Sequence, residues 1–248
     1  MRSIMRYIPV CLCLILSMTT FAFAEKIVVV TEDYPPYSYI EDHRVTGFST
    51  EVVTEVLVRS GLKFSHVRLG VWSGVYETAL NNPNVVIFSI MRTPERDKLF
   101  KWVGMISPVD VYVYRMKSRT DISVSSINDM KRYRVGAYSK GICCQYLEQK
   151  GVPVDIVKDD YLNIRKLVAG RIDLYPSAEL PAEYRVRKEN IIFSDLVSAY
   201  HLKDISGDLY MAFSALTPDE TVERCKKAFA EVQKDGTYEK IRAKYLSD

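Results

Sequence analysis

The first half of the chain alternates between apolar runs and amphipathic stretches. Short runs rich in β-branched residues predict strands at residues 26–31, 64–69 and 85–89. Between them, apolar residues at helical spacing predict helices over residues 47–60 and 72–80. This β-α-β-α-β order is typical of a parallel sheet covered by helices.

A second α/β set follows a strand at residues 109–115, in which apolar and polar side chains alternate. Another crossing strand is predicted at residues 208–214, and the chain then ends in two helices. Between the crossing strands we predict strands at 134–138, 154–157, 172–175 and 191–193, and helices at 141–149, 160–169 and 176–187. The terminal helices are predicted at 219–234 and 238–246.

Two such sets predict an α/β protein with two lobes, each a mixed, mostly parallel sheet with flanking helices, joined by two hinge strands. Lobe 1 is discontinuous and takes residues 25–112 and 208–248, whereas lobe 2 takes residues 113–207. A hinge of this kind closes two lobes around a ligand held between them.

Residues 1–24 are predicted to be a signal peptide. Arg2 and Arg6 precede an apolar run at residues 8–18, and Ala22-Phe23-Ala24 is typical of a cleavage site. The apolar run is too short for a stable membrane span, although an uncleaved anchor is the alternative interpretation. We therefore expect a cleaved mature chain in the bacterial periplasm.

Charge and length narrow the function classes. The whole chain has a formal net charge of +3, and removing the two arginines of residues 1–24 leaves +1. A near-neutral chain without a basic stripe argues against a nucleic-acid partner. A chain of this length buries roughly 70% of its unfolded surface, so it needs no disulfide scaffold.

Three cysteines remain in the mature chain. The adjacent pair Cys143 and Cys144 would bond to each other only with strain, and a bridge from either to Cys225 leaves an odd thiol. No Cys or His spacing is typical of a metal site, and the histidines are scattered. We predict small buried cysteines, no metal and no cofactor.

The most informative motif runs from Ser89 to Arg96. The apolar run of the third strand stops at Ser89, and Thr93 and Pro94 are typical of the cap and first position of a helix. Arg96 then follows the carboxyl end of a strand, where open α/β sheets place their ligands. A guanidinium is a planar, always charged donor suited to a carboxylate, so we predict an anion site at Arg96.

Further short motifs follow one another along the mature chain. They are Tyr34-Pro35-Pro36-Tyr37, Gly47-Phe48, Trp72, Thr93-Pro94-Glu95-Arg96, Gly170-Arg171-Ile172-Asp173 and Asp235-Gly236-Thr237-Tyr238-Glu239-Lys240-Ile241. Because these motifs occur in this order, the chain resembles the family-3 periplasmic solute-binding proteins over essentially its whole mature length. These are the type II bilobed receptors of polar amino-acid ABC transporters.

The resemblance implies a ligand site between the lobes. It implies that Tyr34 and Trp72 flank the ligand side chain, and that Arg96 holds the ligand carboxylate in a charge-assisted contact of about 1.5–3 kcal/mol. Ser89 lies where the family offers backbone or hydroxyl contacts. Met91 lies two residues further on, where amino-acid receptors often carry a hydroxyl.

Two departures from the family pattern lie in the second lobe. The family's Gly-Ser/Thr-Thr turn is replaced by Ser139-Lys140-Gly141-Ile142, so an anion would meet free backbone N–H groups beside Ile142. Ala178 stands where many members place an aspartate for the ligand's α-amino group, with Glu179 next to it. Glu179 either replaces that aspartate or is a solvated helix residue, and the sequence leaves both open.

The leading hypothesis is a binding protein without enzymatic activity that captures a small carboxylate-bearing solute, such as an amino acid or an analogue. By resemblance it works as a monomer and delivers the solute to the membrane permease of an ABC transporter. A ligand-sensing partner of a membrane receptor is one alternative. A dehydratase of the cyclohexadienyl type is another, with Glu32, Asp33, Lys140 and Glu179 as candidate acid and base groups.

Overall fold

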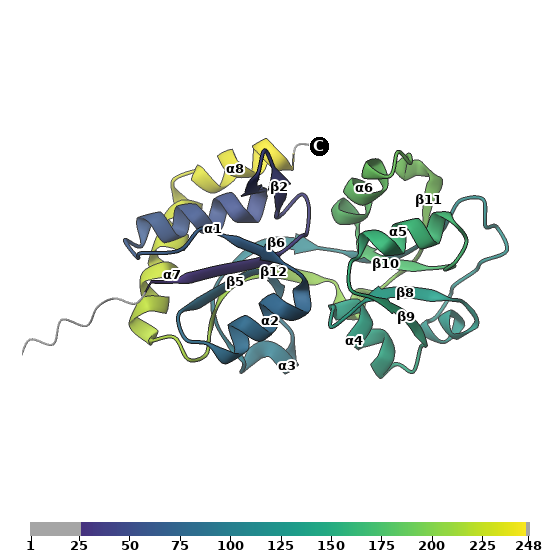
Figure 1. Cartoon of the computed structure of the whole chain (residues 1–248), viewed down its shortest axis with the longest axis horizontal. Coiled ribbons are helices and arrows are strands. Elements are labelled where there is room, and N and C mark those ends of the chain that lie inside the picture. Colours follow the sequence, from purple (N-terminus) through teal and green to yellow (C-terminus); the bar gives the residue numbers. More distant parts are fainter. Residues whose placement is uncertain (1–25, 247–248) are drawn as a thin grey trace, which may run out of the picture.

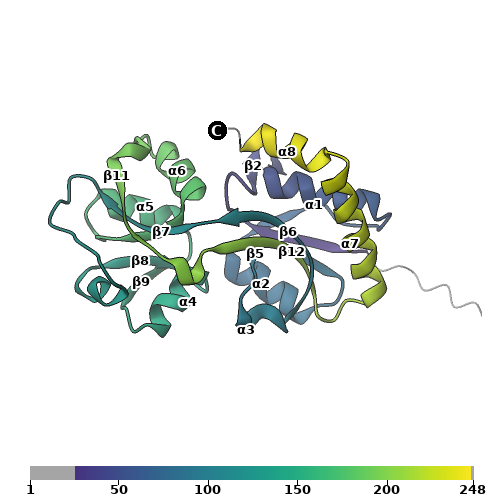
Figure 2. The ribbon, with the colours of Figure 1, turned by 180° about the vertical axis from the view of Figure 1, so that it is seen from behind.

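The computed structural model describes residues 26–246, so the predicted signal peptide lies outside the described residues. Figures 1 and 2 show two lobes side by side, connected by extended segments of the chain. We call the elements within residues 26–109 and 207–246 lobe 1, and those within residues 111–206 lobe 2. The lobe boundaries expected from the sequence, after residues 112 and 207, stay a prediction.

Lobe 1 is built on a five-stranded mixed sheet. In chain order its strands are β1 (Val28–Glu32), β4 (Arg68–Gly70), β5 (Val85–Met91), β6 (Phe100–Val109) and β12 (Gly207–Ser214). The order across the sheet is β4-β1-β5-β12-β6. β1 pairs in parallel with β4 and β5, whereas β12 runs antiparallel to β5 and β6. The parallel half therefore brings the carboxyl ends of β1 and β5 to one edge, which faces lobe 2 (Figure 1).

Helices cover both faces of the lobe 1 sheet. They are α1 (Phe48–Arg59), α2 (Trp72–Asn81), α3 (Pro94–Asp97), α7 (Asp219–Lys234) and α8 (Thr237–Tyr245), and a hairpin of β2 (Tyr39–Glu41) and β3 (Arg44–Thr46) lies beside α1. Val86 and Phe88 of β5 join the buried cluster under α1, whereas Ile87 joins the cluster under α2. Burial on both faces explains why β5 reads as a continuous apolar run.

Lobe 2 combines antiparallel and parallel strands. β10 (Tyr175–Ala178), β7 (Val111–Met116) and β11 (Leu196–His201) form an antiparallel sheet, and β8 (Val135–Tyr138) pairs in parallel with β9 (Val154–Val157). The helices are α4 (Ile142–Gln149), α5 (Tyr161–Val168) and α6 (Glu179–Lys188), with 3₁₀ turns at Ile127–Arg132, Phe193–Asp195 and Lys203–Ile205. The α/β class with mixed sheets and flanking helices is thus confirmed for both lobes.

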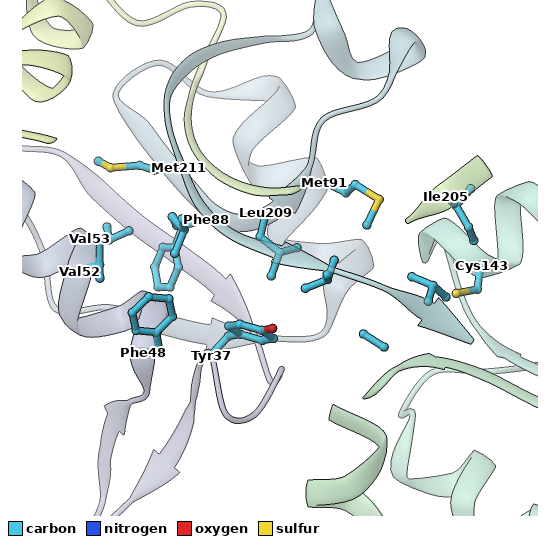
Figure 3. Close-up of a cluster of buried hydrophobic side chains, with 14 of the residues drawn as sticks. Tyr37, Phe48, Val52, Val53, Phe88, Met91, Cys143, Ile205, Leu209 and Met211 are labelled. Atoms are coloured by element: carbon cyan, nitrogen blue, oxygen red, sulfur yellow. The ribbon is translucent and has the colours of Figure 1, made fainter. Parts of the chain in front are cut away.

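The largest cluster of buried side chains continues from one lobe into the other. In Figure 3, Phe48 and Phe88 lie in lobe 1, Cys143 lies in lobe 2, and Leu209 and Met91 lie between them. The two connections between the lobes run from β6 into β7 and from β11 into β12 (Figure 2). Their residues Val109, Val111, Ile205 and Leu209 belong to this buried cluster, so the connections are packed into the core.

Several elements differ from the prediction, among them the strands β2 and β3, which were not predicted. In three further cases pairing with a distant strand outweighs the local pattern. The strand β6 is absent from the predicted set, yet it pairs with β12 along its length. β10 begins and ends later than expected, since Pro176 lies inside the strand opposite Val113 instead of starting a helix. β11 lies beyond the predicted strand at 191–193 and pairs with β7.

The loop after β1 is clamped to the start of α1. The Pro36 carbonyl accepts from Phe48 N at 3.0 Å and the Tyr37 carbonyl accepts from Ser49 N at 2.9 Å, so loop carbonyls satisfy N–H groups that no side chain caps. Gly47 makes this approach possible, because it has φ 114° and a Cβ there would lie 2.6 Å from Tyr37 O. This contact explains why the Tyr34–Tyr37 and Gly47-Phe48 motifs occur together.

We expect Gly47→Ala to lower the free energy of unfolding by about 1–3 kcal/mol, because the methyl group meets backbone and φ is strained. Urea unfolding of the mature protein measures the loss. Gly74→Ala in α2 is the matched control: a Cβ there meets nothing within 4 Å, so it should raise stability by about 0.5–1 kcal/mol. Equal effects of the two substitutions would contradict this account.

Candidate ligand-binding site between the lobes

A cavity of about 40 Å³ lies between the lobes, where the carboxyl ends of β1 and β5 meet lobe 2. Lobe 1 lines it with Glu32, Tyr34, Trp72, Ser89, Met91, Arg96 and Leu209. Lobe 2 lines it with Val111, Tyr138, Ile142, Cys143, Asp160, Pro176, Ser177 and Ala178. Because side chains of both lobes line it, a solute bound there would contact both lobes.

Arg96 is buried at this cavity without an anionic partner. Thr93 caps the short helix α3, its side chain accepting from Arg96 N at 3.4 Å, and this fixes the backbone that carries the guanidinium. The guanidinium carbon lies 5.2 Å from the Trp72 ring centroid and 5.3 Å from that of Tyr76. Nη1 donates to Met91 O at 3.2 Å, but Nη2 is buried with no hydrogen-bond partner among the described residues.

Burial of this guanidinium has an electrostatic consequence. Arg96 is 3% exposed, and its loss of contact with water lowers its pKa, although a guanidinium still remains charged. Within residues 26–246, the ion pairs of 4 Å or less do not include one to Arg96. A buried cation with an unused donor costs free energy, and an anion bound in the cavity would offset that cost.

A bulge in β5 turns Ser89 toward the cavity. Met211 of β12 lies opposite Phe88 and Tyr210 lies opposite Ile90, so Ser89 is the extra residue. Ser89 has φ 57°, in the left-handed region that residues other than glycine rarely occupy. Its buried Oγ has no hydrogen-bond partner among the described residues. The bulge thus presents a free hydroxyl at the strand end, a common device beside binding sites.

Glu32 ends β1 and places a carboxyl on the same cavity. Burial raises the pKa of Glu32 to about 8, although the charge of Arg185 opposes the shift. Asp160 raises it further, whereas the Tyr138 hydroxyl, 3.5 Å from Oε1, and the charge of Arg96 act against it. Glu32 is therefore mostly protonated at pH 7.

Arg185 reaches the lobe interface from α6. It is 2% exposed and forms an ion pair of 3.0 Å with Asp160, whose Oδ2 also accepts from the Tyr175 hydroxyl at 2.8 Å. Nη2 of Arg185 donates across the interface to Asp33 O at 3.4 Å, and the guanidinium lies 5.7 Å from the centroid of the Tyr34 ring. Lobe 2 therefore contributes a cation that is neutralised by its own lobe.

Direct contacts join the rims of the two lobes over the cavity. Trp72 Nε1 donates to Lys140 O at 2.7 Å, and Lys140 Nζ pairs with Glu77 Oε1 at 2.6 Å. Tyr138 approaches Glu32 from the same side. These contacts join residues of different lobes, so they form only when the lobes are closed.

A larger cavity of about 330 Å³ adjoins the first and shares four of its residues. The shared residues are Glu32, Trp72, Tyr138 and Asp160. Its other side carries charged and aromatic groups, among them Asp33, Lys158, Asp159, Tyr161 and Arg185. Together the two cavities offer room for a solute with a compact anionic end and a polar remainder.

Residues 27–248 match the family model of the bacterial extracellular solute-binding proteins, family 3. The chain belongs to this family. As a family-3 protein it is 25% identical over 219 residues to the L-cystine-binding protein TcyJ of Escherichia coli (strain K12), covering 86% of this chain and 79% of that protein.

Solved structures agree on the fold. A histidine kinase sensor domain with similarity to periplasmic binding proteins has a TM-score of 0.79 at 23% identity, covering 90% of this chain and 96% of that one. An ancestral arginine-binding protein bound to glutamine has a TM-score of 0.76 at 21% identity, covering 90% of this chain and 98% of that one. The family-3 protein therefore has the bilobed fold of type II periplasmic binding proteins.

The structure brings six of the seven predicted site residues to one cavity. They are Tyr34, Trp72, Ser89, Met91, Arg96 and Ile142, and their contacts with a ligand stay predictions. Glu179, the seventh, is exposed at the first position of α6 and does not line the cavity. Its neighbour Ala178 does, because β10 extends to residue 178 and turns the next side chain outward.

Glu32, Tyr138 and Asp160 complete the site and are absent from the predicted set of binding residues. Glu32 carries a recognisable signal, since it directly follows a buried strand at the sheet edge where ligands bind. Tyr138 likewise ends β8. Asp160 has no comparable local signal, because only the fold places it against Arg185.

The three cysteines within residues 26–246 are buried with free thiols. Cys143 lines the cavity at the second position of α4, and burial raises its pKa. Burial also raises the pKa of Cys144 and of Cys225 to about 11. The thiols therefore act as small apolar groups at neutral pH, in agreement with the prediction.

The raised pKa of Glu32 predicts a pH-dependent loss of stability. Because the pKa of Glu32 is about 8 in the folded chain against an ordinary value of 4.5, its contribution to stability is present below pH 4.5 and is lost as pH rises through 8. We expect Glu32→Gln to match the wild type near pH 5 and to be more stable by a few kcal/mol near pH 8.5, at about 1.4 kcal/mol per pKa unit.

Urea unfolding at both pH values measures the difference. Glu179→Gln is the control, because it makes the same change at an exposed position outside the cavity and should not reproduce the effect of Glu32→Gln. Parallel profiles for Glu32→Gln and the wild type would show that Glu32 is not held in its neutral form.

Proposed function

We propose that this protein captures a small carboxylate-bearing solute, an amino acid or an analogue, between its lobes. The observation that carries the proposal is the buried Arg96 guanidinium, whose Nη2 lacks a partner among the described residues. A ligand carboxylate would accept from it in a charge-assisted hydrogen bond. The unpartnered Ser89 Oγ on the same cavity would supply a second contact.

The remaining lining suits the apolar part of such a solute. Tyr34 and Trp72 offer aromatic surface, and Met91, Ile142 and Leu209 offer flexible apolar surface. Micromolar affinity requires about 8 kcal/mol of binding free energy. The carboxylate contact contributes about 1.5–3 kcal/mol of this, and burial of apolar surface at about 25 cal/mol per Å² is the main remaining source.

Capture is coupled to closure in this proposal. The small cavity admits a solute only after the Trp72–Lys140 contact opens, and the solute then lies against side chains from both lobes. A ligand that contacts both lobes stabilises the closed state over the open one, which is how a hinge protein responds to its ligand.

We propose a periplasmic location, with residues 1–24 removed, and delivery to the permease of an ABC transporter. Within residues 26–246, no helix has the length and hydrophobicity needed to cross a membrane. The likeness to a histidine kinase sensor domain favours ligand sensing for a membrane receptor as the second candidate. Genomic adjacency to a permease gene or to a sensor gene would separate the two roles.

We propose no enzymatic activity, in keeping with the solute-binding family. The neutral Glu32 carboxyl favours the dehydratase alternative, because a protonated carboxyl on a buried cavity is the form that a general acid requires. Release of product from a cyclic dienyl acid, followed by absorbance, would establish that alternative.

The first test is a thermal-shift screen of the mature protein against amino acids, dipeptides, dicarboxylates and cyclic dienyl acids. A ligand present at 100 times its dissociation constant should add about 2.7 kcal/mol of stability. If no carboxylate raises the melting temperature and only uncharged solutes do, the proposed ligand class is refuted.

The Arg96→Met variant tests the anchor itself. It keeps an unbranched apolar stem but removes the guanidinium that lies over the Trp72 ring, so we expect about a 10- to 150-fold loss of affinity for the carboxylate found in the screen. Arg92→Met is the matched control, since Arg92 pairs with Asp97 outside the cavity and should not affect binding. Isothermal titration measures both, and equal affinities in the two variants would remove Arg96 from the site.

A further inference from the structure

We propose that Lys140 is a positioning residue that clasps helix α2 across the lobe interface and favours the closed lobes even before a solute is bound. The inference rests on the proposed capture of a solute between the lobes and adds a closing element outside the contacts of that solute. Lys140 lines neither the cavity at Arg96 nor the adjoining one, so it acts through Trp72 and Glu77.

The clasp consists of two contacts that one residue of lobe 2 makes with one helix of lobe 1. Trp72 Nε1, at the start of α2, donates to Lys140 O at 2.7 Å, and Lys140 Nζ pairs with Glu77 Oε1 at 2.6 Å. Two other polar contacts between the lobes are longer, 3.5 Å from Tyr138 to Glu32 and 3.4 Å from Arg185 to Asp33 O. Lys140 therefore makes short contacts across the interface with both its backbone and its side chain.

The turn between β8 and α4 presents this lysine to lobe 1. Gly141 N donates to Tyr138 O at 3.1 Å and closes a turn in which Lys140 has φ 59°. A left-handed conformation at this position of a turn favours glycine, so keeping a lysine there costs free energy. The Tyr138 ring packs against Gly141, where a Cβ would lie 2.7 Å from it. In the closed protein the contacts of the Lys140 carbonyl and ammonium with lobe 1 offset that cost.

Helix α2 holds both partners of Lys140 in place. Glu77 Oε2 accepts from Asn81 Nδ2 at 3.2 Å, which orients the carboxylate toward the lobe interface. The hydrogen bond from Lys140 and its charge lower the pKa of Glu77, so the pair is ionised at neutral pH. The Trp72 ring centroid lies 5.2 Å from the guanidinium carbon of Arg96. The indole that Lys140 holds is therefore the one that covers the Arg96 anchor.

The ion pair sets the size of the effect. The side chains of Lys140 and Glu77 are 46% and 50% exposed, so water and salt screen their attraction. An exposed pair of this kind shifts an equilibrium by about two- to fivefold. Because Lys140 and Glu77 belong to different lobes, the equilibrium that shifts is the one between closed and open molecules.

Acrylamide quenching of tryptophan fluorescence in the ligand-free mature protein tests the clasp. Trp72 is 4% exposed and is uncovered when the lobes open, whereas Trp102, the other tryptophan, lies on β6 and contributes equally in every variant. We expect Lys140→Met to raise the quenching constant and Lys140→Arg, which keeps the charge, to restore it. Lys166→Met is the matched control, because Lys166 pairs with Asp155 at 2.8 Å within lobe 2 and should not alter quenching.

A double-mutant cycle shows whether Lys140 acts through Glu77. Glu77→Gln should raise the quenching constant as Lys140→Met does, and the double variant should be quenched no more than either single one. The wild type and Lys140→Met should converge in about 1 M NaCl, because the pair is then screened. With L-arginine and L-cystine as probes, stopped flow should show a bound probe leaving either single variant about two- to fivefold faster than the wild type.

Equal quenching of the wild type, Lys140→Met and Glu77→Gln would overturn this inference, as would effects of the two substitutions that simply add. The quenching measurements need no ligand, so they decide the role of Lys140 even if neither probe binds. Affinity for a carboxylate that depends on Arg96, together with unchanged quenching in the Lys140 and Glu77 variants, would leave the proposed function standing and reject the clasp.

Discussion

The Arg96 guanidinium is held away from water by two aromatic rings and has no carboxylate of its own, and the rest of the site is arranged around that condition. An unpaired buried cation is unfavourable, so the fold must hold it rigidly and leave an anion room to reach it. The Thr93 cap fixes the helix that carries the Arg96 guanidinium, and the bulge at Ser89 lies beside the cavity next to it.

Closure brings charged groups of the two lobes to the same cavity. Lobe 2 brings Arg185 already neutralised by Asp160, whereas lobe 1 brings Glu32 with no cation in contact. Because burial by both lobes raises the pKa of Glu32, the protonation state of this carboxyl depends on how closely the lobes approach. The neutral form of this carboxyl is therefore a consequence of packing between the two lobes.

Much of lobe 1 follows from local pattern. The β-α-β-α-β order and the position of Arg96 at a strand end were readable from apolar runs, from Thr93 and from Pro94, because these signals act over a few residues. The shifted start of α6 was not readable, since Pro176 resembles a helix start and lies in a strand only through pairing with β7. That shift places Ala178 in the cavity and leaves Glu179 in solvent.

The sequence by itself determined the α/β class, the two lobes and six of the residues that line the cavity. It did so because motif order and hydrophobic periodicity are properties of neighbouring residues. Only the tertiary structure decided that Glu32 and Asp160 would share this cavity. It pairs Asp160 with Arg185 and leaves Glu32 without a cation in contact. The state of Glu32 depends on desolvation and on Tyr138, which is 106 residues away, and that of Asp160 on Tyr175 and Arg185, which lie on other elements. No local pattern encodes these contacts.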